Sequence, residues 1–443
     1  MTDSIHDVRA RSGSRREFLK TSGMVAATAA LTGSLSVARS ANARGSDLLK
    51  VALVGAGGRG TGAAANILGT KANVRLVAVA DAFDERLDRS LKALKQMFPA
   101  RVDVPDERKF TGLDGFQKAI DAGVDLVLLC SPPGFRPAHF EAAVKAGKHA
   151  FLEKPVATDG PGVRRVMAAN AEAKRKGLAV AVGHHLRHEV KHKEVVRRMH
   201  DGLIGAIQQV RVYFNSNGVW VRPRLPGQTE MQYQVRNWYY FTWLSGDHIV
   251  EQHVHDLDVG NWIKQAHPIR ANGMGGRQVR IGKDYGEIFD HHAVEFEYAD
   301  GARMFSFCRH IPGCWNSFSE HAQGTKGRVE IEGHGASALF VDGHEPLRFK
   351  RGPDGHQLEM DDFVAALQAG QPYNEADHGA EATLTAILGR MATYSGKIVE
   401  WDAALQSSLD LAPERLSWDA TPKSLPGPDG LYACAIPGAT KAW

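Results

Sequence analysis

Hydrophobic residues between positions 48 and 185 come in short runs that alternate with amphipathic stretches. Apolar runs rich in Val, Leu and Ala occur at 51–54, 74–81 (VRLVAVAD), 124–133 (VDLVLLCSPP), 149–155 (HAFLEKP) and 178–185 (LAVAVGHH). Such runs are typical of strands buried on both faces. Residues 137–148 and 160–177 have helical patterns, ending near Gly147 and starting at Pro161. The alternation predicts an α/β fold with a doubly wound parallel sheet.

Glycines follow the first apolar run at a diagnostic spacing. Gly55, Gly57 and Gly60 lie between this strand and a predicted helix, and the next strand ends at Asp81, 21 residues later. Strand, GxGxxG loop, helix, strand and acid form the dinucleotide-binding pattern. In it, the first glycine permits a tight turn, the second lets amides approach the pyrophosphate, and the third lets helix and strand pack closely. The alternative is a glycine-rich turn that binds nothing.

The acid at the end of the second strand indicates which dinucleotide is bound. The Asp81 carboxylate can accept hydrogen bonds from both ribose hydroxyls and would repel a 2′-phosphate, which favours NAD over NADP. Arg86, five residues after Asp81, weakens that preference, so NADP remains possible. Ligands of such sheets bind outside the carboxyl ends of the strands, where Lys154 is expected.

The densest cluster of polar residues is SGDHIVEQHVHDLDVGNW, residues 245–262. As a strand, it would present Glu251, His253 and His255 as a comb of metal ligands. As a helix, it places Glu251, His255, Asp258 and Trp262 on one stripe, with apolar residues on another. The apolar spacing favours the helix. A metal site, a catalytic acid/base cluster and a polar helix face remain open from the pattern alone.

The first 43 residues have the composition of an export signal. Arg15 and Arg16 precede a mild Ala/Ser/Thr/Gly-rich stretch that ends in small residues at Ala43, as in a twin-arginine signal peptide. A membrane anchor is the weaker alternative because the stretch is poor in large apolar residues. We expect no stable membrane span, and export to the periplasm or the medium by the twin-arginine machinery.

Charge and cysteine content narrow the partners. Residues 1–43 hold six of the 54 basic and three of the 50 acidic residues, so the remaining chain has 48 and 47 and is almost neutral. We therefore expect no nucleic-acid partner. The four cysteines lack metal-binding spacing; Cys308 and Cys314 either pair or stay free.

From about Leu48 to Trp401 the chain resembles the glucose–fructose oxidoreductase/inositol dehydrogenase (Gfo/Idh/MocA) family. The matching pieces are the glycine loop, Asp81, SPP…H, AGKHAFLEKP, LSGDHIVEQHVHDLDVGNW and the stretch 373–401. The resemblance implies a Rossmann domain (47–185) and an α+β domain with a large, mostly antiparallel sheet (186–400). The signal peptide (1–43) would precede these two domains, and a C-terminal tail (401–443) would follow them.

The resemblance also implies site residues. Lys154 corresponds to the lysine of the family's EKP motif, and the Asp-x-x-x-His pair falls on Glu251 and His255, with Asp258 after it. His253 stands where relatives usually have a small residue. The cofactor-binding residues implied by the loop and the strand ends are Gly55, Ala56, Gly57, Gly58, Arg59, Gly60, Asp81, Ser131, Pro132, His139, Glu153 and Lys154.

Alcohol oxidation needs a base for the hydroxyl proton and an acceptor for the hydride. His255 is the expected base, Glu251 would accept from its ring N–H, and Lys154 would stabilise the substrate oxygen. The alternatives are a surface lysine, a helix-capping histidine, and a metal site that also draws on the imidazoles at 184, 185, 188 and 192. We predict no metal.

Nine aromatics lie between residues 213 and 243, and aromatic faces stack on sugar rings. They fit a carbohydrate pocket or, alternatively, a sheet core and subunit interface. Arg222, Arg224 and Arg236 would bind an anionic sugar or are solvated charges. The candidate substrate contacts are His253, Asp258, Arg187 and Trp238.

The sequence therefore predicts an exported NAD-dependent oxidoreductase that acts on a hydroxyl of a sugar or glycoside. Free NAD is not expected outside the cytoplasm, so the cofactor should be tightly bound. One alternative is a redox-neutral NAD-dependent glycosidase with a 3-keto intermediate, as in some exported relatives. The other is a carbohydrate-binding protein with structural NAD. An open sheet suggests a homo-oligomer.

Overall fold

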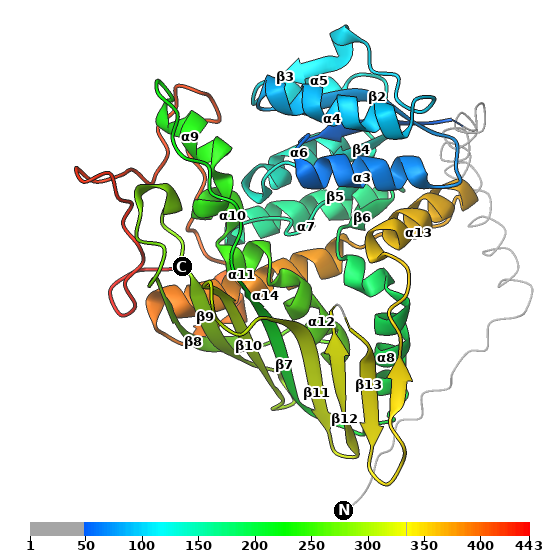
Figure 1. Cartoon of the computed structure of the whole chain (residues 1–443), viewed down its shortest axis with the longest axis vertical. Coiled ribbons are helices and arrows are strands. Elements are labelled where there is room, and N and C mark those ends of the chain that lie inside the picture. The colour runs from blue at the N-terminus through cyan, green and yellow to red at the C-terminus, as the bar shows by residue number, and fades with distance from the viewer. Residues whose placement is uncertain (1–47, 334) are drawn as a thin grey trace, which may run out of the picture. The chain divides into compact units, whose positions relative to one another are not determined.

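The N-terminal half of the chain folds around a six-stranded parallel sheet (Figure 1). The computed structural model describes residues 48–333 and 335–443, so the predicted signal peptide lies outside the described residues. The strand order is β3-β2-β1-β4-β5-β6. The strands are β1 (Leu49–Val54), β2 (Val74–Asp81), β3 (Lys109–Thr111), β4 (Leu126–Leu129), β5 (His149–Leu152) and β6 (Val180–Val182).

Successive residues of β1 point into two different hydrophobic cores. Val51 and Leu53 pack with one cluster, and Ala52 and Val54 with another, as the period of two requires. The helices that follow the first five strands are α3 (Gly58–Gly69), α4 (Asp84–Met97), α5 (Gly115–Ile120), α6 (Arg136–Lys145) and α7 (Gly160–Arg175). The predicted Rossmann architecture is confirmed.

The second half folds around a nine-stranded sheet of order β14-β13-β12-β11-β7-β10-β9-β8-β15. Every neighbouring pair is antiparallel except β7 with β10. The prediction of a large, mostly antiparallel sheet is therefore confirmed. The strands are β7 (Ile207–Ser216), β8 (Arg270–Gly276), β9 (His291–Glu297), β10 (Arg303–His310), β11 (Ser317–Gly324), β12 (Gly327–Glu332), β13 (Ser337–Val341), β14 (Leu347–Phe349) and β15 (Val399–Glu400).

Burial along β9 and β10 alternates residue by residue, which shows that helices cover one face of this sheet. α12 (Val254–Lys264) packs on β7 and β11, and α14 (Ala376–Ser395) packs on β8 and β9. α14 also contacts α7, so it lies between the two sheets (Figure 1). The remaining helices are α8 (Val190–His200), α9 (Glu230–Arg236), α10 (Thr242–Ser245), α11 (His248–Glu251), α13 (Gly355–Ala369) and α15 (Trp401–Leu405).

The periodicity of the polar stretch 245–262 predicts one continuous helix, but the structure has two helices there. α11 ends at Glu251 and α12 begins at Val254, with Gln252 and His253 between them. Glu251 and His255 therefore lie on different helices. The break changes the direction of the polar stripe, which decides what each of its side chains contacts.

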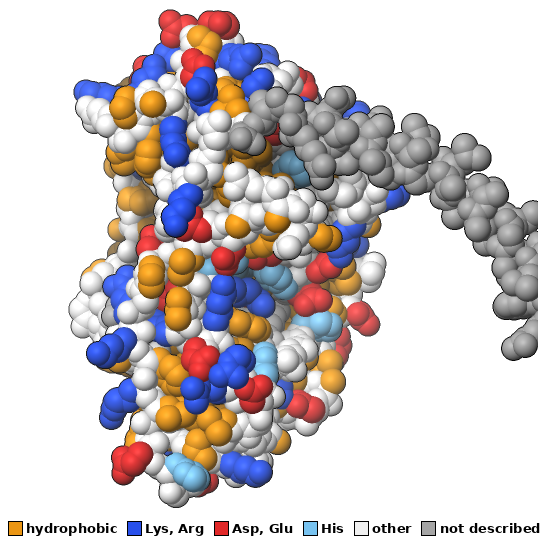
Figure 2. All heavy atoms as spheres, turned by 90° about the vertical axis from the view of Figure 1, so that its right-hand side faces the viewer, with side chains coloured by type: hydrophobic (Ala, Val, Ile, Leu, Met, Phe, Trp, Pro, Cys, Tyr) orange, Lys and Arg blue, Asp and Glu red, His pale blue; other side chains and the backbone are white. Residues whose placement is uncertain are grey.

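The two halves are linked by packing as well as by the chain. Met360 and Phe363 of α13 belong to the same hydrophobic cluster as α3, and the Gln357 side chain donates to the backbone oxygen of Asn66 at 3.0 Å. Contacts join Leu49–Trp443 into one compact unit. On the face drawn in Figure 2, acidic and basic side chains are interspersed, with no extended patch of one sign.

Candidate functional site

The glycine loop after β1 combines tight packing with an open side. Gly55 has φ +94°, and a Cβ there would lie 2.5 Å from the carbonyl carbon of Cys130. A Cβ at Gly60 would lie 1.8 Å from the Gly55 oxygen, whereas at Gly57 or Gly58 it would meet nothing within 4 Å. No side chain caps the first turn of α3, and no acid lies in it. The free amides and the open space fit a bound diphosphate.

Asp81, at the end of β2, is buried beside this loop. Its Oδ2 accepts from the Ala56 amide at 2.7 Å and its Oδ1 from the Phe83 amide at 3.0 Å. Burial raises the pKa of Asp81, while the Arg86 guanidinium and these two amides lower it. Carboxylate oxygens have further lone pairs, so two ribose hydroxyls can still be accepted.

A cavity adjoins Asp81, where the dinucleotide-binding pattern would place the adenosine half of the cofactor. Its lining includes Asp81, Arg86, Ser131, Pro132, His139 and Val235. The His139 ring stacks on Phe116 with centroids 4.0 Å apart, and its Nδ1 lies 3.3 Å from Ser131 Oγ. Burial, assisted by Arg136, lowers the pKa of His139 to about 3, so the ring is neutral. Ser131 and His139, two predicted cofactor residues, thus line the cavity, and the neutral His139 ring stacked on Phe116 forms part of its wall.

Lys154 and Glu251 form an ion pair between the two halves of the chain. Lys154 follows β5, and its Nζ lies 3.0 Å from Glu251 Oε1 while also donating to the Glu251 backbone oxygen. The side chains are 11% and 15% exposed, so the pair is reachable but largely desolvated. The preceding residue, Glu153, pairs with Arg59 of the glycine loop at 3.0 Å.

The predicted hydrogen bond from His255 to Glu251 does not form. His255 Nδ1 is buried without a hydrogen-bond partner in the described part of the chain, because the break between α11 and α12 turns the two side chains apart. Burial first, and then Lys154 and His185, hold the pKa of His255 well below its usual range. The ring is 9% exposed. The ring is therefore neutral, with a lone pair on one nitrogen.

Arg187 and Asp258 contact each other. Arg187 Nε and Nη2 donate to the two Asp258 oxygens at 2.7 and 2.9 Å, and the guanidinium lies 5.2 Å from the Trp262 ring centroid. Although burial raises it, Arg187 and His184 hold the pKa of Asp258 down to about 2. Both oxygens of the buried Asp258 accept from Arg187, whereas Arg187 is 19% exposed and can donate further hydrogen bonds.

The other two predicted substrate contacts lie elsewhere. His253 is fully buried, with Nδ1 3.1 Å from Asp256 Oδ2 and Nε2 2.8 Å from Ser306 Oγ on β10. It faces the sheet rather than a cavity, so the packing alternative explains it and a substrate contact does not. Trp238 is half-buried and packs against Trp220, with ring centroids 5.8 Å apart.

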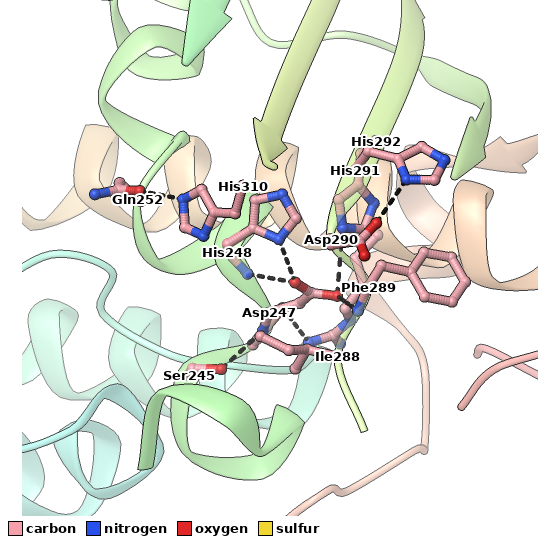
Figure 3. A network of polar contacts seen from close by, with 12 residues as sticks. Ser245, Asp247, His248, Gln252, Ile288, Phe289, Asp290, His291, His292 and His310 are labelled. Carbon is pink, nitrogen blue, oxygen red and sulfur yellow. Dashed lines mark hydrogen bonds and ion pairs between the residues drawn. The ribbon is translucent and has the colours of Figure 1, made fainter. Parts of the chain in front are cut away.

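The metal alternative built on Glu251, His253 and His255 finds no support, because these side chains point to different partners. Within residues 48–333 and 335–443, the side chains that could hold a metal are instead Asp247, His248 and His292 (Figure 3). The Asp247 carboxylate is already occupied by the Phe289 amide at 2.9 Å, the Tyr394 hydroxyl at 2.6 Å and His248.

This network holds α11 in place. Asp247 caps the helix by accepting from the His248 amide, and it connects the helix to the start of β9 and to α14. Burial opposes ionisation, but His292 and His248 hold the pKa of Asp247 well below its usual range. The helix that ends at Glu251 is therefore fixed by a buried hydrogen-bond network around the Asp247 carboxylate (Figure 3).

His184 and His185 entered the sequence analysis only as ligands of the alternative metal site, and His356 entered it not at all, yet all three lie near the predicted base. The His185 ring lies 4.8 Å from His255 and 3.9 Å from His356 of α13, while His184 lies 6.0 Å from His255. His184 is 1% exposed; its Nδ1 lies 3.6 Å from Asp258 Oδ2, and among the described residues neither ring nitrogen has a hydrogen-bond partner. The cluster of histidines at 184–192 was visible in the sequence, but the approach of α13 was not.

Comparison with known proteins gives the family of the first domain. Residues 49–184 match the GFO_IDH_MocA model, an oxidoreductase family with an NAD-binding Rossmann fold. Residues 14–32 match a twin-arginine translocation signal sequence, which supports export across a membrane. None of the helices that the structure describes is long and apolar enough to span a membrane.

Similar proteins match over most of the chain. Inositol 2-dehydrogenase from Rhizobium meliloti (strain 1021) is 25% identical over 73% of this chain and 89% of its own length. The structure of aldose-aldose oxidoreductase from Caulobacter crescentus, complexed with glycerol, matches with a TM-score of 0.63 and 20% identity, over 80% of this chain and 99% of that one. Levoglucosan dehydrogenase, in complex with NADH and levoglucosan, also matches with a TM-score of 0.63, at 16% identity over 80% and 99%.

The glycine loop, the acid at the end of β2 and the two-sheet architecture agree with these matches. Residues 49–184 therefore belong to the Gfo/Idh/MocA family of NAD-binding oxidoreductases, and the chain carries a twin-arginine signal sequence.

Proposed function

We propose that this protein is an exported NAD-dependent oxidoreductase that acts on a hydroxyl of a sugar or cyclitol in the periplasm or the medium. The names of its relatives support this substrate class, since they include an inositol 2-dehydrogenase, an aldose-aldose oxidoreductase and a levoglucosan dehydrogenase. We expect the domain boundaries to follow the two sheets, with a substrate-binding domain from residue 186 to 400.

The observation that carries the proposal is the convergence of Lys154, Glu251 and a neutral His255 at the carboxyl edge of the parallel sheet. His255 accepts the proton of the reacting hydroxyl. Lys154 donates to the substrate oxygen and stabilises its developing negative charge. Glu251 orients Lys154, whereas the sequence had predicted that it orients His255. NAD, held by the glycine loop and Asp81, would accept the hydride.

The experiment uses the exported protein with its own nucleotide. Mass spectrometry identifies the retained nucleotide, and absorbance in the reduced-nicotinamide band is followed while sugars, cyclitols and glycosides are added. His255→Asn and Lys154→Met should each lower kcat by about 10²- to 10⁴-fold with retained nucleotide. His344→Asn is the matched control because His344 is exposed on a turn. An unchanged nicotinamide spectrum with every compound would instead support a carbohydrate-binding protein with structural NAD.

A second candidate, redox-neutral glycoside cleavage, is favoured by the position of His184. After oxidation to a ketone, elimination needs a base for the proton on the adjacent carbon, and His184 supplies a second imidazole near His255, with ring centroids 6.0 Å apart. Burial lowers the pKa of His184 to about 4, so it is neutral. A glycoside that is cleaved without net NADH, and that takes up deuterium from D2O beside the oxidised carbon, would identify this reaction.

A further inference from the structure

The last 38 residues, 406–443, form a segment that is anchored at several places; we call it the C-terminal segment. It contains no helix and only an isolated bridge between Pro426 and Tyr432. The Leu411 amide donates to Asp159 Oδ2 at 2.9 Å, and the Gly438 amide donates to the Ser395 oxygen at 2.7 Å. The segment therefore contacts the start of α7 and the end of α14, and it is no loose tail.

Between these anchors the C-terminal segment holds α9. Thr229 Oγ1 donates to the Trp418 oxygen at 3.0 Å, and Gln234 Nε2 donates to the Ser424 oxygen at 2.8 Å. The Tyr432 hydroxyl donates to Glu230, at the first turn of α9. These three contacts come from both ends of the helix. α9 cannot move outward without breaking them.

α9 in turn lines one side of the cavity beside Asp81. Val235 is the lining residue that comes from the second half of the chain; the others come from the Rossmann half. The Trp418 ring lies 5.6 Å from the ring of Phe83, two residues after Asp81. Leu411, Trp418 and Ala420 pack against the same hydrophobic cluster as Val235 and Phe135. The Rossmann half and α9 thus line the cavity, and the C-terminal segment packs behind α9 and against Phe83.

We propose that the C-terminal segment, through Trp418 and α9, is the outer wall of the dinucleotide site and slows release of NAD. The inference rests on the dinucleotide site of the proposed function. Release of a ligand from a closed site requires the wall to open first, so contacts that hold the wall lower the rate of dissociation. For an enzyme working outside the cytoplasm, such retention replaces a supply of free NAD.

The test measures release rather than turnover. The full chain is loaded with NADH, excess ADP-ribose is added as competitor, and the loss of bound NADH fluorescence gives the dissociation rate. Trp418→Ala should release NADH at least 10-fold faster than wild type. Trp315→Ala is the matched control because Trp315 is 65% exposed and lies beside β11, and it should leave the rate unchanged.

A second variant separates wall opening from misfolding. Tyr432→Phe removes one hydrogen bond to α9 but no wall atom, and it should accelerate release in the same direction by a smaller factor. Circular dichroism checks that both variants are folded. Folded variants that release NADH at the wild-type rate would overturn the proposal while leaving the oxidoreductase function intact. A wild-type protein that binds no dinucleotide would overturn both.

Discussion

Replacing Arg187 by Met tests whether this side chain supports the fold or binds substrate. Its partner Asp258 is 1% exposed and keeps a pKa of about 2 against an ordinary 3.8. That difference corresponds to about 2.4 kcal/mol of native-state stabilisation at neutral pH. Since the folded pKa is depressed, the stabilisation is present above about pH 4 and is lost as the pH falls through 2. In Arg187→Met the Asp258 carboxylate would stay buried without the positive charge that compensates it. We therefore expect the free energy of unfolding to fall by more, about 3 to 5 kcal/mol.

The assay is urea unfolding at pH 7, followed by circular dichroism, with Arg197→Met as the matched control. Arg197 also pairs with carboxylates, but it is 57% exposed, so its loss should cost under about 1 kcal/mol. The double variant R187M/D258N should recover part of the stability because no charge remains buried without a partner.

The opposite pattern would refute this reasoning. If Arg187→Met unfolds like Arg197→Met but raises KM for the substrate, the guanidinium serves substrate binding and the ion pair contributes little to the fold.

Two further predictions follow from packing and burial. Gly60→Ala should lower the thermal midpoint and prevent dinucleotide retention, because its Cβ would lie 1.8 Å from a backbone oxygen, whereas Gly58→Ala should leave the midpoint nearly unchanged; equal midpoints would contradict the close helix–strand packing. The free energy of unfolding should fall between pH 7 and pH 5, by up to about 1.4 kcal/mol per pH unit for each of His139 and His184. Their folded pKa values, about 3 and about 4, lie below the ordinary 6.5, so unfolding takes up protons in this range. The pKa values of His188 and His192 are raised in the folded state, and these two residues oppose the effect only in part. Urea midpoints at pH 7.5, 6 and 5 measure this; a midpoint that rises on acidification would contradict it.

The architecture was predictable where its signals are local. Apolar runs ending in Asp81 or at Lys154, and glycines at fixed spacing, depend on the chain's near neighbours, and the parallel sheet appears where they predict it. The large second sheet was predicted from the family resemblance and not from local patterns. The family and the twin-arginine signal are likewise confirmed.

The site was predictable only in its residue types. Lys154, Glu251 and His255 do lie near one another, but periodicity predicted the wrong pair because it assumed one helix through residue 253. Whether these residues act as proposed stays a prediction. The C-terminal segment gave no local signal, since its contacts are backbone groups and single aromatic rings.

The sequence by itself determined the parallel sheet, the dinucleotide loop and the export signal, because each depends on spacing within a few tens of residues. Only the tertiary structure decided that Glu251 pairs with Lys154, that Asp258 pairs with Arg187, and that residues 406–443 hold α9, whose Val235 lines the cavity at Asp81. These contacts join residues about 70 or more positions apart. Such pairings depend on how two sheets and their helices pack, and packing leaves no periodic trace in the sequence.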